Sequence, residues 1–218
     1  MQNTLSVGGF ISFGWETFKK RPWFFVGMLV LIWIVSGVFS QMGSYTDKVS
    51  AGSELIFALA GVFVSIVGQM FVKMGTVNFV LKAHDVPESS KLNDLWAPEM
   101  FWQYLGASLL VGLIVVVGVI LLIVPGIIWA LRYMFVPYLV IDRKLGVMAA
   151  LRESSRITLG HKLQLLGLVV VLGLLNILGL LALVVGLLVT VPVTMFAVAH
   201  AYRTLEHSAS EVAPAPAA

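Results

Sequence analysis

Two basic residues lie within long apolar runs, where a charged side chain is costly. Lys73 falls inside the run 55–81, and Arg132 falls inside the run 127–141. No Asp or Glu lies within the apolar runs, so neither cation has an acidic partner at its own depth. Two interpretations stay open. Each side chain either extends to the membrane surface or binds an anion, such as a substrate or a lipid head group.

The other residues capable of chemistry form no recognisable motif. The four histidines are not spaced as metal ligands: His84, His161, His200 and His207. The absence of cysteine excludes thiolate nucleophiles and disulfides. Asp85 and Glu88 could form an acid–base pair, but their polar connector favours solvated charges, and Ser154 and Ser155 have no nearby base. We therefore predict no catalytic residue, no metal site and no cofactor.

The composition predicts that a lipid bilayer surrounds most of the chain. Of the 218 residues, 59% are hydrophobic and 11% are charged, with a mean hydropathy of +0.98; soluble domains carry about 25% charged residues. A span needs about 20 apolar residues to cross roughly 30 Å of hydrocarbon. The runs that qualify as one or more spans are 23–42, 55–81, 102–124, 127–141 and 163–202.

The longest run must contain two spans, because it is twice as long as one span requires. We expect a turn near Gly186, and Pro125-Gly126 is a second turn signal, between the third and fourth spans. Pro137 and Pro192 are expected to kink the fourth and sixth spans. The predicted fold is an all-α polytopic membrane bundle of six transmembrane helices.

The six spans also suggest three repeated hairpins. Gly27, Gly106 and Gly167 follow similar entry positions, at intervals of 79 and 61 residues. The stretches 10–20, 89–98 and 147–159 precede the hairpins and are predicted to be interfacial helices. The alternative is the loose similarity that any six-helix protein shows.

The distribution of Lys and Arg predicts the orientation. With the N-terminus inside, eleven basic residues fall on the inner side: Lys19, Lys20, Arg21, Lys82, Lys91, Arg143, Lys144, Arg152, Arg156, Lys162 and Arg203. The outer loops hold Lys48 alone. Such a bias places both termini in the cytoplasm. Residues 1–206 are predicted to form one six-helix membrane domain, and the Ser-, Ala- and Pro-rich residues 207–218 a disordered tail.

Five of the inner basic residues surround the third interfacial stretch. They are Arg143, Lys144, Arg152, Arg156 and Lys162. Such a cluster favours contact with anionic lipid head groups. The alternative is that these charges only determine topology. The predicted partners are membrane lipids, anionic lipids among them, and not nucleic acid; a protein partner or a homo-oligomer is left open.

The segment 120–205 resembles a known family. The residues that carry the resemblance are Ile123 to Ile128, Arg132-Tyr133, Pro137-Tyr138, Asp142, Ala150 to Ser155, Thr158 and Gly160-His161. They resemble an uncharacterised family of bacterial multi-pass membrane proteins, related to the membrane domain of some glycerophosphoryl diester phosphodiesterases. The resemblance implies the bacterial cytoplasmic (inner) membrane. It carries over no catalytic residue, because the active site of those enzymes belongs to a soluble domain.

These observations favour a function without catalysis. The first hypothesis is a membrane scaffold or interaction protein. The alternative is a transporter or lipid-handling protein with an inward-facing cationic cavity, which Lys73 and Arg132 would line. A membrane-embedded hydrolase fits the sequence least.

Overall fold

The computed structural model describes residues 6–44, 54–88, 90–96, 98–182 and 185–212, and these residues contain helices but no strands. The α-helices are α1 (Val7–Lys20), α2 (Pro22–Ser44), α3 (Glu54–Asp85), α4 (Phe101–Leu121), α5 (Ile123–Tyr133), α6 (Val136–Asp142), α7 (Val147–Ile157), α8 (Lys162–Leu181) and α9 (Leu187–Val212). Two short 3-10 helices, η2 (Leu92–Leu95) and η3 (Pro98–Met100), precede α4. Lys48 and residues 213–218 of the predicted tail lie outside the described residues.

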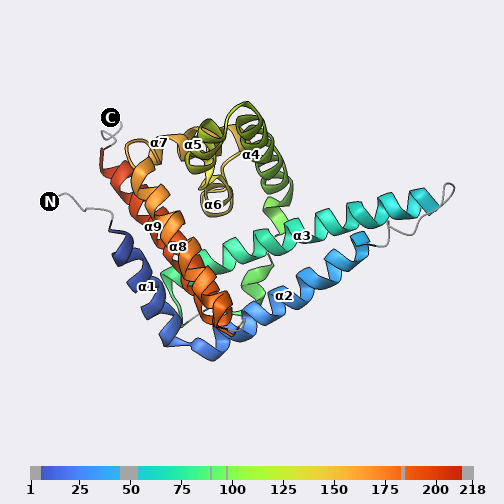
Figure 1. Cartoon of the computed structure of the whole chain (residues 1–218), viewed down its shortest axis with the longest axis horizontal. Helices are drawn as coiled ribbons and strands as arrows, with labels where there is room; N and C mark the ends of the chain where they lie inside the picture. Colours follow the sequence, from blue (N-terminus) through green and yellow to red (C-terminus); the bar gives the residue numbers. More distant parts are fainter. Residues whose placement is uncertain (1–5, 45–53, 89, 97, 183–184, 213–218) are drawn as a thin grey trace.

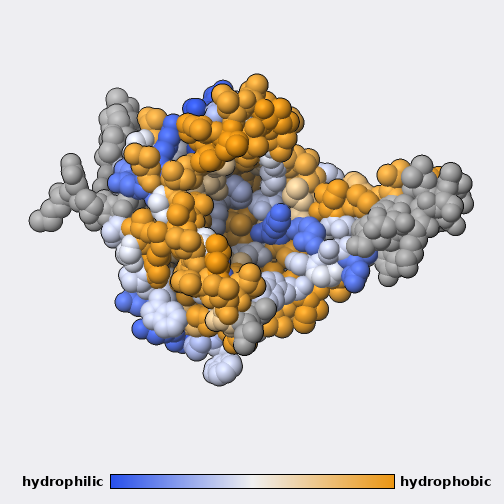
Figure 2. Space-filling model, viewed as in Figure 1, coloured by the Kyte–Doolittle hydropathy of each residue, from blue (hydrophilic) through white to orange (hydrophobic). Residues whose placement is uncertain are grey.

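Within the described ranges, six spans are long and apolar enough to cross a membrane, which confirms the predicted all-α polytopic bundle. They are Pro22–Gln41, Leu59–Asp85, Leu92–Leu121, Ile123–Asp142, Lys162–Leu181 and Leu187–Ser210. The spans pair as three hairpins, α2–α3, α4–α5 and α8–α9, which point in different directions from a shared centre (Figure 1). Most of their surface is hydrophobic, as contact with lipid requires (Figure 2).

The turn between the third and fourth spans lies earlier than Pro125-Gly126. Helix α4 ends at Leu121, and α5 begins at Ile123 after the single extended residue Leu122. Pro125 therefore lies in the first turn of α5, where a missing backbone N–H removes no intrahelical hydrogen bond. Gly126 is needed because an added Cβ would lie 2.8 Å from the backbone nitrogen of Val119. The predicted turn near Gly186 is confirmed between α8 and α9.

The fourth span is two helices rather than one. It breaks at Met134 and Phe135, and Pro137 occupies the first turn of α6. Proline cannot donate the next helical hydrogen bond, so the kink predicted for this span is a full break. The break places α6 at the centre of the bundle, where Val136, Leu139 and Val140 are completely buried.

Short segments precede all three hairpins, but only two of them are α-helices. The predicted stretches 10–20 and 147–159 correspond to α1 and α7, whereas 89–98 contains the 3-10 turns. The prediction of an interfacial helix at 89–98 was wrong, because Pro87 lies just before that stretch and Pro98 ends it. Ser6 caps the start of α1: its hydroxyl accepts a hydrogen bond from the backbone N–H of Gly9 at 3.1 Å.

Helix α9 continues through Val212, beyond the start of the tail predicted from His207. The hydroxyls of Ser208 and Ser210 donate back to carbonyls one turn earlier, and Arg156 donates to the carbonyl of Ala209 at 3.3 Å. These contacts explain why a Ser- and Ala-rich stretch is helical here. The last turns of α9 are thus joined to α7.

Candidate functional site: a charge network and an apolar groove

Arg203 connects three helices at one end of the bundle. Its guanidinium donates to Asp142 of α6 at 2.6 Å, to Asp85 of α3 at 2.7 Å and to Glu206 of α9 at 3.2 Å. The side chain is only 18% exposed, so these charge-assisted bonds form largely away from water. The hydroxyl of Tyr202 also donates to Asp142, at 2.9 Å. We call this end of the bundle the polar end.

The network continues through Arg143 to α7. Arg143 donates to Glu206 at 2.5 Å and to Glu153 at 3.4 Å, and Arg156 donates to Glu153 at 2.7 Å. The hydrogen bond from Arg156, which outweighs partial burial, holds the pKa of Glu153 below its usual value. Burial opposes ionisation of Arg143, yet the bond to Glu206 raises its pKa. Each charge in this chain of contacts has an opposite neighbour.

Two histidines from distant parts of the sequence meet beside Arg203. His84 Nε2 and His200 Nδ1 lie 3.1 Å apart, and His84 Nδ1 lies 3.0 Å from the carboxylate of Asp85. The ring of Phe13 in α1 stacks on His200, with centroids 3.9 Å apart and planes 9° apart. The pair therefore joins α1, α3 and α9.

A cavity of about 750 Å³ opens at the polar end. Its lining is His84, Asp85, Arg143, His200, Arg203, Thr204, Glu206, His207, Ser208 and Ser210. The two arginines are neutralised by carboxylates, so the cavity has mixed charge. Within the described residues, no group of three or more His, Cys, Asp or Glu is arranged to hold a metal ion.

Lys73 and Arg132 lie on different helices, outside the polar cavity. Arg132 is exposed at the end of α5 and donates from Nε to the hydroxyl of Ser155 at 2.6 Å. Lys73 is exposed in the middle of α3. Figure 2 shows hydrophilic surface over the middle of α3, in a hollow between the hairpins. Both cations can therefore reach an anion.

The five basic residues around α7 differ in their contacts. Arg143 and Arg156 belong to the charge network, and Lys144 lies 3.8 Å from Glu99. Arg152 is exposed and Lys162 is half-buried. Arg152 and Lys162 have no ion pair within the part of the chain that the structure describes.

Sequence reasoning missed the acidic and histidine side chains of the polar end. Asp85 and Asp142 are the last residues of α3 and α6, and Glu206 lies near the end of α9. The sequence did contain one indication of this cluster, namely a carboxylate near the same end of several spans. The partners that join different helices are 60 or more residues away in sequence, as with Tyr202 and Asp142, so spacing alone did not reveal them.

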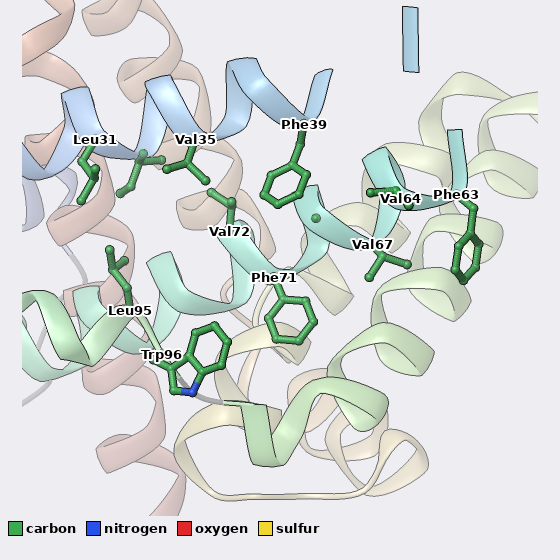
Figure 3. A pocket seen from close by; sticks show the side chains of 12 residues that line it. Leu31, Val35, Phe39, Phe63, Val64, Val67, Phe71, Val72, Leu95 and Trp96 are labelled. Atoms are coloured by element: carbon green, nitrogen blue, oxygen red, sulfur yellow. The ribbon is translucent and has the colours of Figure 1, made fainter. Parts of the chain in front are cut away.

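A second cavity of about 540 Å³ is an apolar groove between α2 and α3 (Figure 3). Its lining is Leu31, Ile32, Val35, Phe39, Phe63, Val64, Val67, Gly68, Phe71, Val72, Leu95 and Trp96. Phe39 and Phe71 border it from opposite helices, and Trp96 lies near one end. Apart from the indole N–H of Trp96, the side chains that line the groove are apolar, so it suits an apolar ligand.

The segment η2 closes that end of the groove and is held firmly on α3. The side chain of Asn78 donates to the carbonyl of Asp94 at 2.7 Å, and Lys82 pairs with the Asp94 carboxylate at 2.8 Å. Gly75 permits the approach, because an added Cβ would collide with the carbonyl of Leu95. Trp96 stacks on Phe71, with ring centroids 6.0 Å apart.

Comparison with known proteins supports the conclusion that this chain is a membrane protein, but it indicates no molecular activity. The chain is 27% identical over 108 residues to a protein of Pectobacterium carotovorum described as a "UPF0259 membrane protein". The match covers 49% of this chain and 43% of that protein, so the chain spans less than half of its length. No family model and no solved structure matches the chain. Together with the six apolar spans, the similarity shows a multi-pass membrane protein.

Proposed function

We propose that this protein is a non-enzymatic scaffold or interaction protein of the bacterial cytoplasmic membrane. The observation that carries the proposal is the closed charge network of the polar end, in which the arginines and carboxylates bind one another. Such a network fixes the helices relative to one another and pairs its own arginines and carboxylates with each other. The strong basic bias supports a cytoplasmic polar end and cytoplasmic termini. We also propose that this membrane protein is related to the membrane domain of some glycerophosphoryl diester phosphodiesterases.

The contact surface is the apolar groove of the first hairpin, and its occupant is the acyl chain of a membrane lipid. A transmembrane helix about 10 Å wide and 30 Å long occupies roughly 2,400 Å³, far more than the 540 Å³ groove holds. Lys91 is exposed at the start of η2, on the same segment as Trp96. Its charge complements an anionic head group at the interface.

The experiment is to fill the groove and count retained lipids. Val64 lines the groove and is 39% exposed, so Val64→Phe adds bulk there without burying a polar group. Val170→Phe, at a 52% exposed position of α8, is the matched control. Native mass spectrometry after incorporation of phosphatidylglycerol should show fewer retained lipids for Val64→Phe alone. Equal retention in the parent and both variants would contradict an acyl-chain site in the groove.

A lipid-handling or transport function is the second candidate, because the polar cavity is large enough to hold a ligand. The mixed charge of the cavity distinguishes it from the cationic cavity first hypothesised. Proteoliposomes containing fluorescent phosphatidylglycerol separate the two candidates. A scaffold leaves transbilayer lipid movement at the rate of empty liposomes, whereas a lipid-handling protein accelerates it.

A further inference from the structure

His84 Nε2 and His200 Nδ1 form a hydrogen bond only when one of these two nitrogens carries a hydrogen and the other does not. His84 Nδ1 faces the Asp85 carboxylate at 3.0 Å, so that nitrogen carries a hydrogen. In the neutral pair, His84 Nε2 then accepts from His200 Nδ1 across 3.1 Å. One added proton can be shared in the same geometry, with Asp85 as the counter-charge. A second proton places N–H groups on both facing nitrogens and removes the acceptor.

The surroundings of the pair determine what a second proton does. From α1, the uncharged rings of Phe10 and Phe13 face His200. On α3, the carboxylate of Asp85 favours protonation of His84. Arg203 on α9 binds Asp85, and its positive charge opposes that protonation. Arg143, Glu206 and His207 line the same cavity, and Asp142 of α6 is engaged by Arg203. No unpaired carboxylate among the described residues touches His200, so a doubly protonated pair has Asp85 as its direct counter-charge.

We infer that His84 and His200 form a proton-binding site that controls whether the seam between α3 and α9 opens toward the polar cavity. With no proton or one proton added, the pair closes the seam between these two helices. With two, the hydrogen bond is lost and like charges face each other, so the seam opens toward the polar cavity. The ligand is the proton, and the site does not depend on the scaffold proposal. Histidine is suited to this role because it gains its charge near physiological pH. The second proton is bound only at lower pH, because the pair already carries a positive charge.

The chain lacks cysteine, so a single introduced thiol reports on the seam. Ala83 is completely buried beside His84, and Ala83→Cys places a thiol there. Ser12→Cys, on the exposed side of α1, corrects for the pH dependence of the reagent. The measurement is the ratio of the two labelling rates with a small neutral methanethiosulfonate. From about pH 8 to about pH 4, this ratio should rise several-fold, with the rise in the acidic part of the range where the second proton binds.

Variants of the histidines make the test specific. His84→Gln and His200→Gln keep hydrogen-bonding groups but do not titrate, and either should abolish the pH dependence. His207→Gln, in the same cavity, and His161→Gln, beside Gln164, should retain it. A ratio that stays constant with pH in the parent would overturn the inference. So would a rise that survives in both His84→Gln and His200→Gln.

Discussion

Helices α1 and α7 lie in matching places on the bundle but are held by different contacts. Helix α1 packs on α9, and α7 packs on α5 and α6. Their first residues, Val7 and Val147, lie against Gly167 of α8 and Gly106 of α4. Val7 and Val147 are 140 positions apart in sequence, and Gly167 and Gly106 are the two entry glycines 61 positions apart. A threefold repeat would relate contacts at these intervals, and the repeat itself stays a prediction.

The same offsets relate the closest contacts of the two helices. Gly14 of α1 lies against the carbonyl of Val193, where an added Cβ would come within 2.5 Å. Ser154 of α7, again 140 positions on, donates to the carbonyl of Arg132 at 2.8 Å. Val193 and Arg132 are 61 positions apart. One helix is thus seated by close backbone approach and the other by a hydrogen bond, so equal placement does not require equal chemistry.

The difference extends to the neighbouring positions. Phe13 precedes Gly14 and stacks on His200, whereas Glu153 precedes Ser154 and pairs with Arg143 and Arg156. The α1 contact is therefore made of shape and ring stacking, and the α7 contact of charge and hydrogen bonds. We expect steric changes to disrupt α1, and pH or loss of a polar atom to disrupt α7.

The largest effect is expected from Gly14→Leu. The added side chain must displace the backbone of α9 or expel α1, because a carbonyl oxygen occupies its space. Overpacking typically costs about 1–3 kcal/mol, and rigid backbone is the least able to yield. Thermal unfolding in detergent should show a clear loss of stability. Gly8→Leu, on the same helix with open space around it, is the control and should be tolerated.

An intermediate effect is expected from Ser154→Ala. The side chain is completely buried, and its hydrogen bond to the Arg132 carbonyl contributes about 0.5–1.5 kcal/mol. Thr158 also reaches that carbonyl, at 3.3 Å, and partly replaces the bond. Ser12→Ala, at an exposed position of α1, is the control and should leave the melting temperature unchanged. If Ser154→Ala were as stable as the parent, close approach alone would seat α7 as it seats α1.

A smaller, pH-dependent effect is expected at Glu153. Its pKa is held below the usual 4.5 by Arg156, so its stabilising contribution is present above pH 4.5 and is lost as the pH falls through the lowered value. Half-exposed ion pairs contribute below about 1 kcal/mol. Glu153→Gln should therefore be less stable than the parent at neutral pH and nearly equal to it at low pH. A constant difference across both conditions would contradict the ion-pair explanation.

The smallest effect on stability is expected from Arg132→Met, which removes the exposed bond to Ser155. Lys73→Met is its counterpart on α3. If the two cations bind lipid phosphate, both variants should retain less anionic lipid in native mass spectrometry, with normal membrane insertion. Equal retention and equal stability in the parent and both variants would favour snorkelling or packing.

Hydropathy predicted the spans well because a bilayer imposes one length and one composition on every crossing helix. It also located α7, whose polar and apolar residues alternate with helical spacing. It could not separate α5 from α6 by composition, since both are apolar. It placed the Pro125 turn too late, because proline is also stable in a first helical turn.

The polar end was beyond such reasoning for a different reason. Asp85, Asp142 and Glu206 border the spans and look like solvated loop charges in sequence. The contacts of Asp85 and Asp142 with Arg203 depend on how three hairpins converge. His84 and His200 are likewise 116 positions apart, so neither suggests the other. Lys73 and Arg132 were easier to notice because their depth in a span is a local property.

The tight turns described above bear on how the chain enters the membrane. Leu122 alone separates α4 from α5, and the connection 182–186 between α8 and α9 contains no charged residue. Under the proposed topology, these two turns can cross the bilayer without carrying a charge through the hydrocarbon, where each charge costs about 2.5–3.5 kcal/mol on insertion scales. With both termini cytoplasmic, as proposed, the first hairpin must carry Asp47, Lys48 and Glu54 across. Its insertion is therefore the step that depends most on the cell's translocation machinery.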